Sequence, residues 1–261
     1  MNATANALDR PTISLVGRLR IGARLGSMLL LLIACVPLYY LWRLARLPNP
    51  WPRIFLGGIA RIAGARIRVT GAKAQGGAFL LSNHVSWLDI PVIAGISGSA
   101  FIAHSGLAEI GLLKWLCAMN DTVFVARHDR RTVHAQVELV RAALTDTGAL
   151  TVFPEGTTSD GHGLLPFKSS LLSALDPVPP GIAIQPLWID YGPDVASIAW
   201  VGEEHGLDNF LKILARRRPV PVTVHFLPPL AADETANRKT MAAAARERIM
   251  AAMDSVKAGA R

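Results

Sequence analysis

The stretch "LLSNHVSWLDIP", residues 80–91, contains an abrupt change from apolar to polar residues. An apolar run that is typical of a strand ends at Ser82, His84 follows it, and Asp89 comes five positions later. On a continuous helix, five residues turn the chain by about 500°, so the two side chains would point roughly 140° apart. They could not meet on such a helix, but they can face each other if His84 lies in a loop after a strand and Asp89 lies in the first turn of a helix.

Two helix starts satisfy this requirement. The segment "SWLD" matches a capping box with Ser86 as N-cap and Asp89 as N3. A helix that starts at Asp89 itself would place Pro91 in the first turn, where proline is tolerated. With either start, the acid can accept the N–H of the His84 imidazole and leave the other ring nitrogen available as a base. A carboxylate that only caps the helix is the alternative.

From about residue 65 onward, short apolar or β-branched runs recur, and helix-like segments lie between them. The clearest helical periodicity covers residues 129–146, and further helices are expected over 168–175 and 233–258. Alternation of strands with helices predicts an α/β fold with a largely parallel central sheet flanked by helices. The runs expected to form strands are 66–70, 78–82, 100–104, 122–127, 149–153, 182–189 and 220–227.

The N-terminal part of the chain has a different character. Residues 25–42 contain no charged side chain and are just long enough to cross a bilayer, and a shorter amphipathic segment follows over 53–64. Basic residues flank the apolar run on both sides, which favours a helical hairpin that enters one leaflet. We therefore expect membrane-anchoring helices over residues 1–64 and an α/β domain over 65–261. An ordinary buried helix is the alternative for the apolar run.

The composition restricts the classes of partner. The formal net charge of +8 favours an anionic partner, such as nucleic acid, a phosphorylated substrate or the acidic cytoplasmic leaflet of a membrane. The two cysteines do not form a pattern typical of a disulfide framework or a zinc site. The sequence lacks G-x-S-x-G, Walker A and H-E-x-x-H motifs, which disfavours a covalent serine enzyme and a metalloenzyme. No metal or cofactor is predicted.

Two further segments contain candidate binding residues. "VFPEGTTSDG" places Glu155, Gly156 and Thr157 directly after a predicted strand, where backbone N–H groups and hydroxyls can bind an oxyanion or a phosphate. Arg127 follows another predicted strand, at the edge where ligands collect in open α/β folds, and Lys168 can reach the same crevice. The alternatives are a plain surface turn for the loop and a surface lysine for Lys168.

A base, an acid that orients it and several anion binders, attached to a membrane anchor, suit one type of reaction. They favour direct attack of a lipid hydroxyl on an activated acyl group, because the thiolate leaving group of such a donor needs little assistance.

Taken together, "NHVSWLD", "FVAR", "FPEGTTS" and "IAIQPLWI" closely resemble, in content and order, the motifs of the glycerolipid acyltransferase family. The resemblance is to the lysophosphatidate acyltransferases of this family, which are 1-acyl-sn-glycerol-3-phosphate O-acyltransferases. It implies that His84 deprotonates the acceptor hydroxyl and that Asp89 polarises His84. It also assigns the acceptor head group, typically phosphate, to Arg127 and to the loop of Glu155, Gly156 and Thr157.

Because a carboxylate beside a phosphate is not obviously favourable, Glu155 is interpreted as fixing the loop or pairing with Arg127. The family also often has Gly-Ala after the lysine of this region, whereas Ser169 and Ser170 follow Lys168 here. This departure leaves the acceptor open, although it does not affect the predicted base.

The resemblance implies an enzyme that transfers a fatty acyl group from acyl-CoA or acyl carrier protein to the free hydroxyl of 1-acylglycerol-3-phosphate, giving phosphatidic acid. It would lie on the cytoplasmic face of the inner membrane as a monotopic or single-pass protein, against an anionic membrane surface. Lyso-ornithine lipid or another lysophospholipid is the alternative acceptor.

A non-catalytic basic protein that binds membrane or nucleic acid is a further alternative. It is disfavoured because no aromatic residues alternate with the basic residues at 127–131 and 215–219, so a nucleic-acid partner is not expected.

Overall fold

The structure, a computed structural model, describes residues 13–104, 111–125, 143–144 and 147–259. The strands within these ranges form a single seven-stranded sheet in the order β1-β7-β6-β2-β5-β3-β4. All neighbouring strands pair in parallel except β6 and β7, which are antiparallel. The predicted α/β class with a largely parallel sheet is therefore confirmed. The strands are β1 (Ala65–Thr70), β2 (Gly77–Ser82), β3 (Ala100–His104), β4 (Val123–Val125), β5 (Ala149–Val152), β6 (Ile182–Asp190) and β7 (Val220–Phe226).

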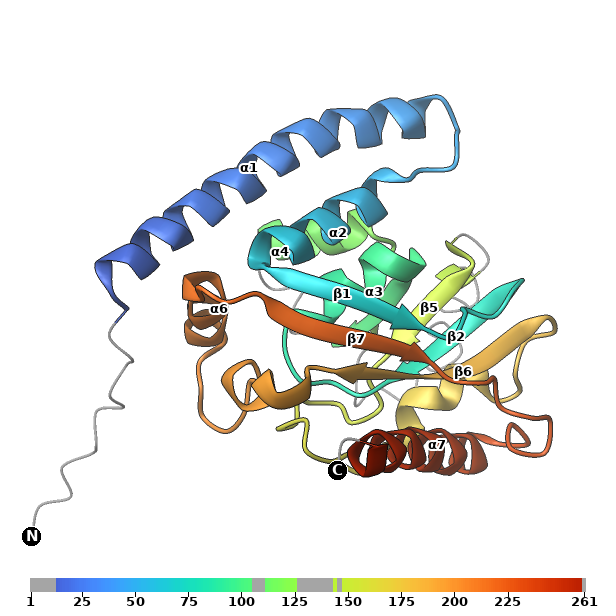
Figure 1. Ribbon diagram of the computed structural model, residues 1–261. Helices are drawn as coiled ribbons and strands as arrows, with labels where there is room; N and C mark the ends of the chain where they lie inside the picture. The colour runs from blue at the N-terminus through green and yellow to red at the C-terminus, as the bar shows by residue number, and fades with distance from the viewer. Residues whose placement is uncertain (1–12, 105–110, 126–142, 145–146, 260–261) are drawn as a thin grey trace, which may run out of the picture.

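Helices cover both faces of the sheet (Figure 1). Successive side chains of a strand point to opposite faces, and in β2 Leu80 belongs to one core cluster while Leu81 belongs to another. The first cluster also contains residues of α2 and α3, and the second contains residues of α7. The described helices are α1 (Leu15–Leu44), α2 (Trp51–Ala63), α3 (Asp89–Ser97), α4 (Gly111–Met119), α6 (Gly206–Ala215) and α7 (Arg238–Gly259), with 3-10 helices η3 (Ser169–Leu175) and η4 (Gly192–Ser197).

Some predicted elements differ from the observed ones. Nearly all of the helix expected over 129–146 lies outside the described residues, as do the last two residues of the strand expected over 122–127. The helix expected over 168–175 is present as the 3-10 helix η3. α2 begins at Trp51, inside a proline-rich segment, because Pro52 occupies the first turn, where its missing N–H costs nothing.

α1 is longer than the apolar run that predicts it. Ser14 caps its start by accepting the N–H of Gly17 at 3.2 Å, so the arginines that precede the apolar run lie within the helix. Among the described residues, α1 is the helix that is long and apolar enough to cross a membrane. Only 6% of its most apolar 18-residue window is buried, and Leu30 and Ile33 are among the exposed side chains. An ordinary buried helix does not fit this exposure.

α1 and α2 form a hairpin that lies against the sheet domain. α2 packs against both α1 and α3, and β1 begins at Ala65, directly after the short turn that ends α2. The packing of α2 on α3 is close because glycines face each other. A Cβ atom built on Gly95 of α3 would lie 2.5 Å from the Cα atom of Gly57 in α2. The division of the chain at residue 64 stays a prediction.

We expect Gly95→Ala to lower the free energy of unfolding by about 1–3 kcal/mol, because the added methyl group pushes α2 away from α3. Gly22→Ala is the matched control, since a Cβ there meets nothing within 4 Å and alanine favours a helix. Thermal unfolding of both variants in detergent tests this expectation. Equal melting temperatures for the two variants would contradict the close helix contact.

Candidate active site

Three adjacent strands end at the same edge of the sheet. β2 lies between β5 and β6 and runs parallel to both, so the residues that follow these strands meet in space. Asn83 and His84 follow β2, Phe153 and Glu155 follow β5, and Tyr191 follows β6. The carboxyl edge of a parallel sheet is where ligands bind in open α/β folds, so this convergence defines the candidate site.

His84 and Asp89 are in direct contact. The Nδ1 atom of His84 lies 2.8 Å from the Oδ2 atom of Asp89. Asp89 is the first residue of α3, so the helix begins at the second of the two predicted starts, with Pro91 in the first turn. The Asp89 side chain is fully buried, whereas that of His84 is 17% exposed. Because no described residue hydrogen-bonds to Nε2 of His84, the ring has an available nitrogen opposite its carboxylate partner.

Hydrogen-bond donors surround the buried Asp89 carboxylate. Its Oδ2 atom also accepts the backbone N–H groups of Val85 at 2.6 Å and Ser86 at 3.0 Å. Its Oδ1 atom accepts the hydroxyl of Tyr191 at 2.6 Å. Burial, together with the charge of Asp89, raises the pKa of Tyr191 well above its ordinary value. The hydroxyl therefore stays protonated and donates a hydrogen bond to Asp89. The N-terminus of α3 adds a favourable dipole for the negative charge.

Glu155 joins the "FPEGT" loop to the turn that carries His84. Its Oε1 atom accepts the backbone N–H of His84 and its Oε2 atom accepts that of Leu165, both at 2.9 Å. Burial raises the pKa of Glu155, and these two N–H groups oppose that shift. Since both carboxylate oxygens bind within the protein, the geometry favours the interpretation that Glu155 fixes the loop.

Other contacts hold the His84 ring and backbone. Phe153 stacks on the imidazole with ring centroids 4.0 Å apart and an angle of 14° between the planes. Ser159 donates to the carbonyl of His84 from its backbone N–H at 2.8 Å and from its hydroxyl at 3.1 Å. The backbone N–H of Trp200 donates to the carbonyl of Val85 at 2.9 Å. Residues 83–89 carry the predicted base, and we call this segment the catalytic turn. These contacts fix most of its backbone polar groups.

The remaining predicted binding residues lie around this loop. Gly156 has a φ of +71°, a left-handed conformation that favours glycine, and Thr157 is exposed beside it. The backbone N–H of Lys168 donates to the carbonyl of Pro154 at 2.8 Å, and the lysine is exposed. Arg127 lies outside the described residues.

Tyr191 is the main site residue that the sequence did not indicate. It lies directly after the predicted strand 182–189 and the additional strand residue Asp190. The sequence signal for Tyr191 is its position directly after a strand. That position points to the site only when it is known that this strand, β6, lies next to β2.

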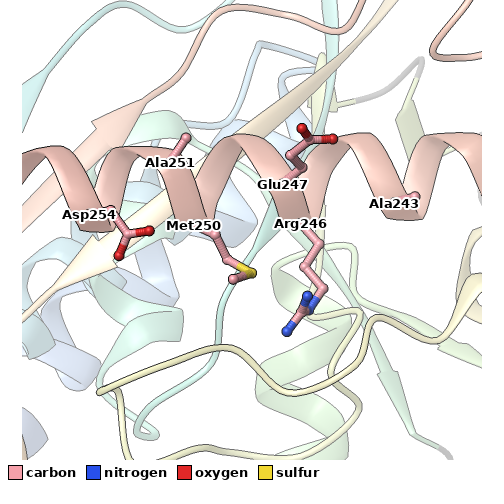
Figure 2. A pocket seen from close by; sticks show the side chains of 6 residues that line it. All are labelled: Ala243, Arg246, Glu247, Met250, Ala251 and Asp254. Carbon is pink, nitrogen blue, oxygen red and sulfur yellow. The ribbon is translucent and has the colours of Figure 1, made fainter.

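A separate hollow of about 500 Å³ lies along α7 (Figure 2). Among its residues, Arg246 donates to the carbonyl of Leu164 at 3.0 Å and so supports the segment that contacts Glu155. None of the residues of the catalytic turn lines it. The lining residues are Ala243, Arg246, Glu247, Met250, Ala251 and Asp254. Among the described residues, no group of three or more His, Cys, Asp or Glu side chains could hold a metal ion.

We expect Glu155→Gln to lower both stability and turnover. The amide provides only one carbonyl oxygen, so one of the two backbone N–H groups now faces another N–H, which costs about 1–3 kcal/mol. Glu203→Gln, at an exposed glutamate, is the matched control and should change neither property. Thermal unfolding and kcat measured on both variants test the role of Glu155 in holding His84. Identical behaviour of the two variants would contradict it.

Comparisons with known proteins identify the family of this chain. Residues 66–190 match the model of the family described as Acyltransferase. The chain is 32% identical to the lyso-ornithine lipid O-acyltransferase of Rhodobacter capsulatus over 94% of both chains. It is 31% identical to the enzyme of that name from Brucella abortus, over 94% of this chain and 98% of the relative.

Two further similarities concern acyltransferases of lysophosphatidate type. The 1-acyl-sn-glycerol-3-phosphate acyltransferase of Neisseria gonorrhoeae is 38% identical over 38% of this chain and 40% of its own. The crystal structure of the 1-acyl-sn-glycerophosphate acyltransferase from Thermotoga maritima has the same fold, with a TM-score of 0.59 and 22% identity, over 79% of this chain and 78% of that one. The family match and the relatives that align with nearly the whole chain show that this chain belongs to the acyltransferase family and is an acyltransferase.

Proposed function

We propose that this acyltransferase acylates the free hydroxyl of a lysolipid, with His84 as the general base and Asp89 as the acid that orients it. The observation that carries this proposal is the 2.8 Å contact between Nδ1 of His84 and the buried carboxylate of Asp89. This contact keeps a proton on Nδ1 and leaves the lone pair on Nε2 for the substrate.

The reaction needs one proton acceptor and one electrophile. Nε2 of His84 removes the proton of the lysolipid hydroxyl while the oxygen attacks the carbonyl carbon of a fatty acyl thioester. The tetrahedral intermediate then expels the thiolate, and the imidazolium returns its proton to the sulfur. During these steps the Asp89 carboxylate stabilises the positive charge on the ring, as carboxylates do beside catalytic histidines.

The donor is an acyl thioester of coenzyme A or acyl carrier protein. A thioester suits this site, because a thiolate can leave without a second catalytic acid. Thr157, exposed beside the left-handed Gly156, and the exposed Lys168 are available to bind anionic groups of the substrates. Arg127 is proposed for the acceptor head group on the strength of its motif alone.

For the acceptor, we favour a lyso-ornithine lipid. The support comes from the relatives that match almost the whole chain, which are lyso-ornithine lipid O-acyltransferases. The motifs alone rank 1-acylglycerol-3-phosphate first, and it remains the second candidate. The specific observation in its favour is the 38% identity to a 1-acyl-sn-glycerol-3-phosphate acyltransferase, which covers only 38% of the chain.

We further propose that α1 and α2 attach the enzyme to the cytoplasmic face of the inner membrane. The exposed apolar side chains of α1 would enter one leaflet, and the excess of basic residues would favour anionic lipids. This placement brings the site to the lipid acceptor while the donor arrives from the cytoplasm.

We expect His84→Ala to reduce kcat by at least about 10²–10⁴-fold without loss of folding, because it removes the base. Asp89→Asn keeps an oxygen for the N–H of the ring but removes the charge that stabilises the imidazolium, so kcat should fall by a similar order. Turnover of a labelled acyl-CoA, with circular dichroism to verify folding, measures both effects. Wild-type activity of His84→Ala would remove the proposed base.

The acceptor is identified by assaying the purified enzyme with one acyl donor and equal amounts of lyso-ornithine lipid and lysophosphatidate. We expect kcat/KM to be at least about 100-fold higher for the lyso-ornithine lipid, because a site built for one polar head group leaves the wrong one unpaired. A preference for lysophosphatidate would establish the second candidate instead.

A further inference from the structure

The carbonyl groups at the C-terminal end of α6 receive hydrogen bonds from two arginines of α1. Arg20 donates to the carbonyl of Ala215 at 2.7 Å. Arg24 donates to the carbonyls of Ile213 at 3.1 Å and Leu214 at 2.9 Å. The last carbonyls of a helix have no partner within the helix, and positive charge at that end is favourable. The guanidinium groups of α1 thus supply both the hydrogen-bond donors and the positive charge that the C-terminal end of α6 favours.

α2 holds the C-terminal end of α3 in the same way. Arg53 donates to the carbonyls of Gly95 at 3.2 Å and Ile96 at 2.9 Å. The close approach of Gly57 to Gly95 lies at this same end of α3. In Figure 1, the N-terminal end of α1 lies near α6, and α2 lies between α1 and the sheet domain. The N-terminal hairpin therefore holds the C-terminal ends of two helices.

The other parts of these two helices support the catalytic turn. α3 begins with Asp89 itself. On α6, the buried Asn209 accepts the hydroxyl of Ser86 at 3.4 Å, and the ring of Phe210 packs on Trp87 with centroids 4.9 Å apart. Ser86 and Trp87 lie in the turn between His84 and the start of α3. α6 therefore forms one wall of the turn that carries the proposed base.

α6 supports the turn by a second route as well. The amide nitrogen of Asn209 donates to the carbonyls of Ile198 at 3.3 Å and Ala199 at 3.1 Å. The next residue, Trp200, donates its backbone N–H to the carbonyl of Val85. A displacement of α6 would thus move both Ser86 and the segment that contacts Val85.

We propose that Arg20 and Arg24 are positioning residues for acyl transfer, which rests on the proposed role of His84 as the base. By holding the end of α6 against α1, they fix Asn209 and Phe210 and, through them, the position of His84. The helix has ten residues and is about 15 Å long, so it can transmit a shift from one end to the other as a rigid body. A misplacement of about 1 Å at a reacting group can cost on the order of 100-fold in rate.

The test compares the double variant Arg20→Gln/Arg24→Gln with the wild type, both full length, purified in the same detergent micelles and assayed with acyl-CoA and a lysolipid. We expect kcat to fall about tenfold while KM for the lysolipid stays within about twofold, since substrate binding groups are untouched. Arg24→Lys keeps the charge and a donor at the end of α6, so with Arg20 intact it should retain most of the wild-type kcat.

Arg18→Gln is the matched control for the loss of positive charge next to the membrane. Arg18 is also on α1, but its hydrogen bond goes to the carbonyl of Ile13, just before the helix. The kcat of Arg18→Gln should remain within about twofold of that of the wild type. Thermal unfolding verifies that each variant is folded at the assay temperature. If the double variant does not fold, Arg20→Gln alone, which loses a single bond to α6, should show a smaller decrease in kcat, of about threefold.

Two results would overturn the inference. One is a kcat for the folded Arg20 and Arg24 variants that equals that of Arg18→Gln. The other is a rise in KM with unchanged kcat, which would assign the two arginines to membrane or substrate binding. Retained activity of His84→Ala would instead remove the proposed function, and the inference with it, so the two failures are distinguishable.

Discussion

A single buried carboxylate holds the site together. Removal of a charged group from water is costly unless hydrogen bonds replace the lost hydration, and Asp89 receives four such bonds. The donors come from three places: the ring of His84, two backbone N–H groups of the catalytic turn, and Tyr191 after β6. The same interaction that stabilises the charge therefore fixes the turn, orients the imidazole and joins the turn to a neighbouring strand.

The parallel sheet explains why these groups can meet at all. β5, β2 and β6 are adjacent and end at one edge, so three segments far apart in the sequence contribute to one small volume. Asn83 strengthens this edge, because its side chain bonds both backbone groups of Ile189 in β6, at 2.7 Å and 3.0 Å. Phe153 then covers one face of the imidazole from β5. Function in this arrangement depends on strand order as much as on the residues themselves.

Much of this arrangement follows from local sequence signals. The runs of β-branched and apolar residues predicted every described strand to within a few residues, and a polar break after a strand placed His84 in a loop. The five-residue spacing to Asp89 excluded contact on a continuous helix and favoured a loop followed by a helix, and α3 begins at that residue. These features follow from the spacing of apolar residues and from the residues at a helix start, which are local properties of the chain. They can therefore be predicted from one sequence.

The rest depends on long-range contacts that no local pattern encodes. The antiparallel pairing of β7 with β6 joins residues 33–39 positions apart. The contact of Tyr191 with Asp89 joins residues 102 positions apart, and the hydrogen bond from Arg24 to Leu214 at the end of α6 joins residues 190 positions apart. The orientation of Glu155 toward the backbone of His84 likewise requires the neighbouring strand to be in place. Such contacts become visible only once the strand order is known.

The protonation pattern of one imidazole tests the central claim most directly. A ¹⁵N NMR spectrum of ring-labelled histidine, with His84 assigned by its loss in a His84→Gln sample, reports which nitrogen carries the proton in the neutral ring. A proton on Nδ1 with an unprotonated Nε2 is the result that the contact with Asp89 predicts. A proton on Nε2 would leave the ring without a base toward the substrate and would contradict the account.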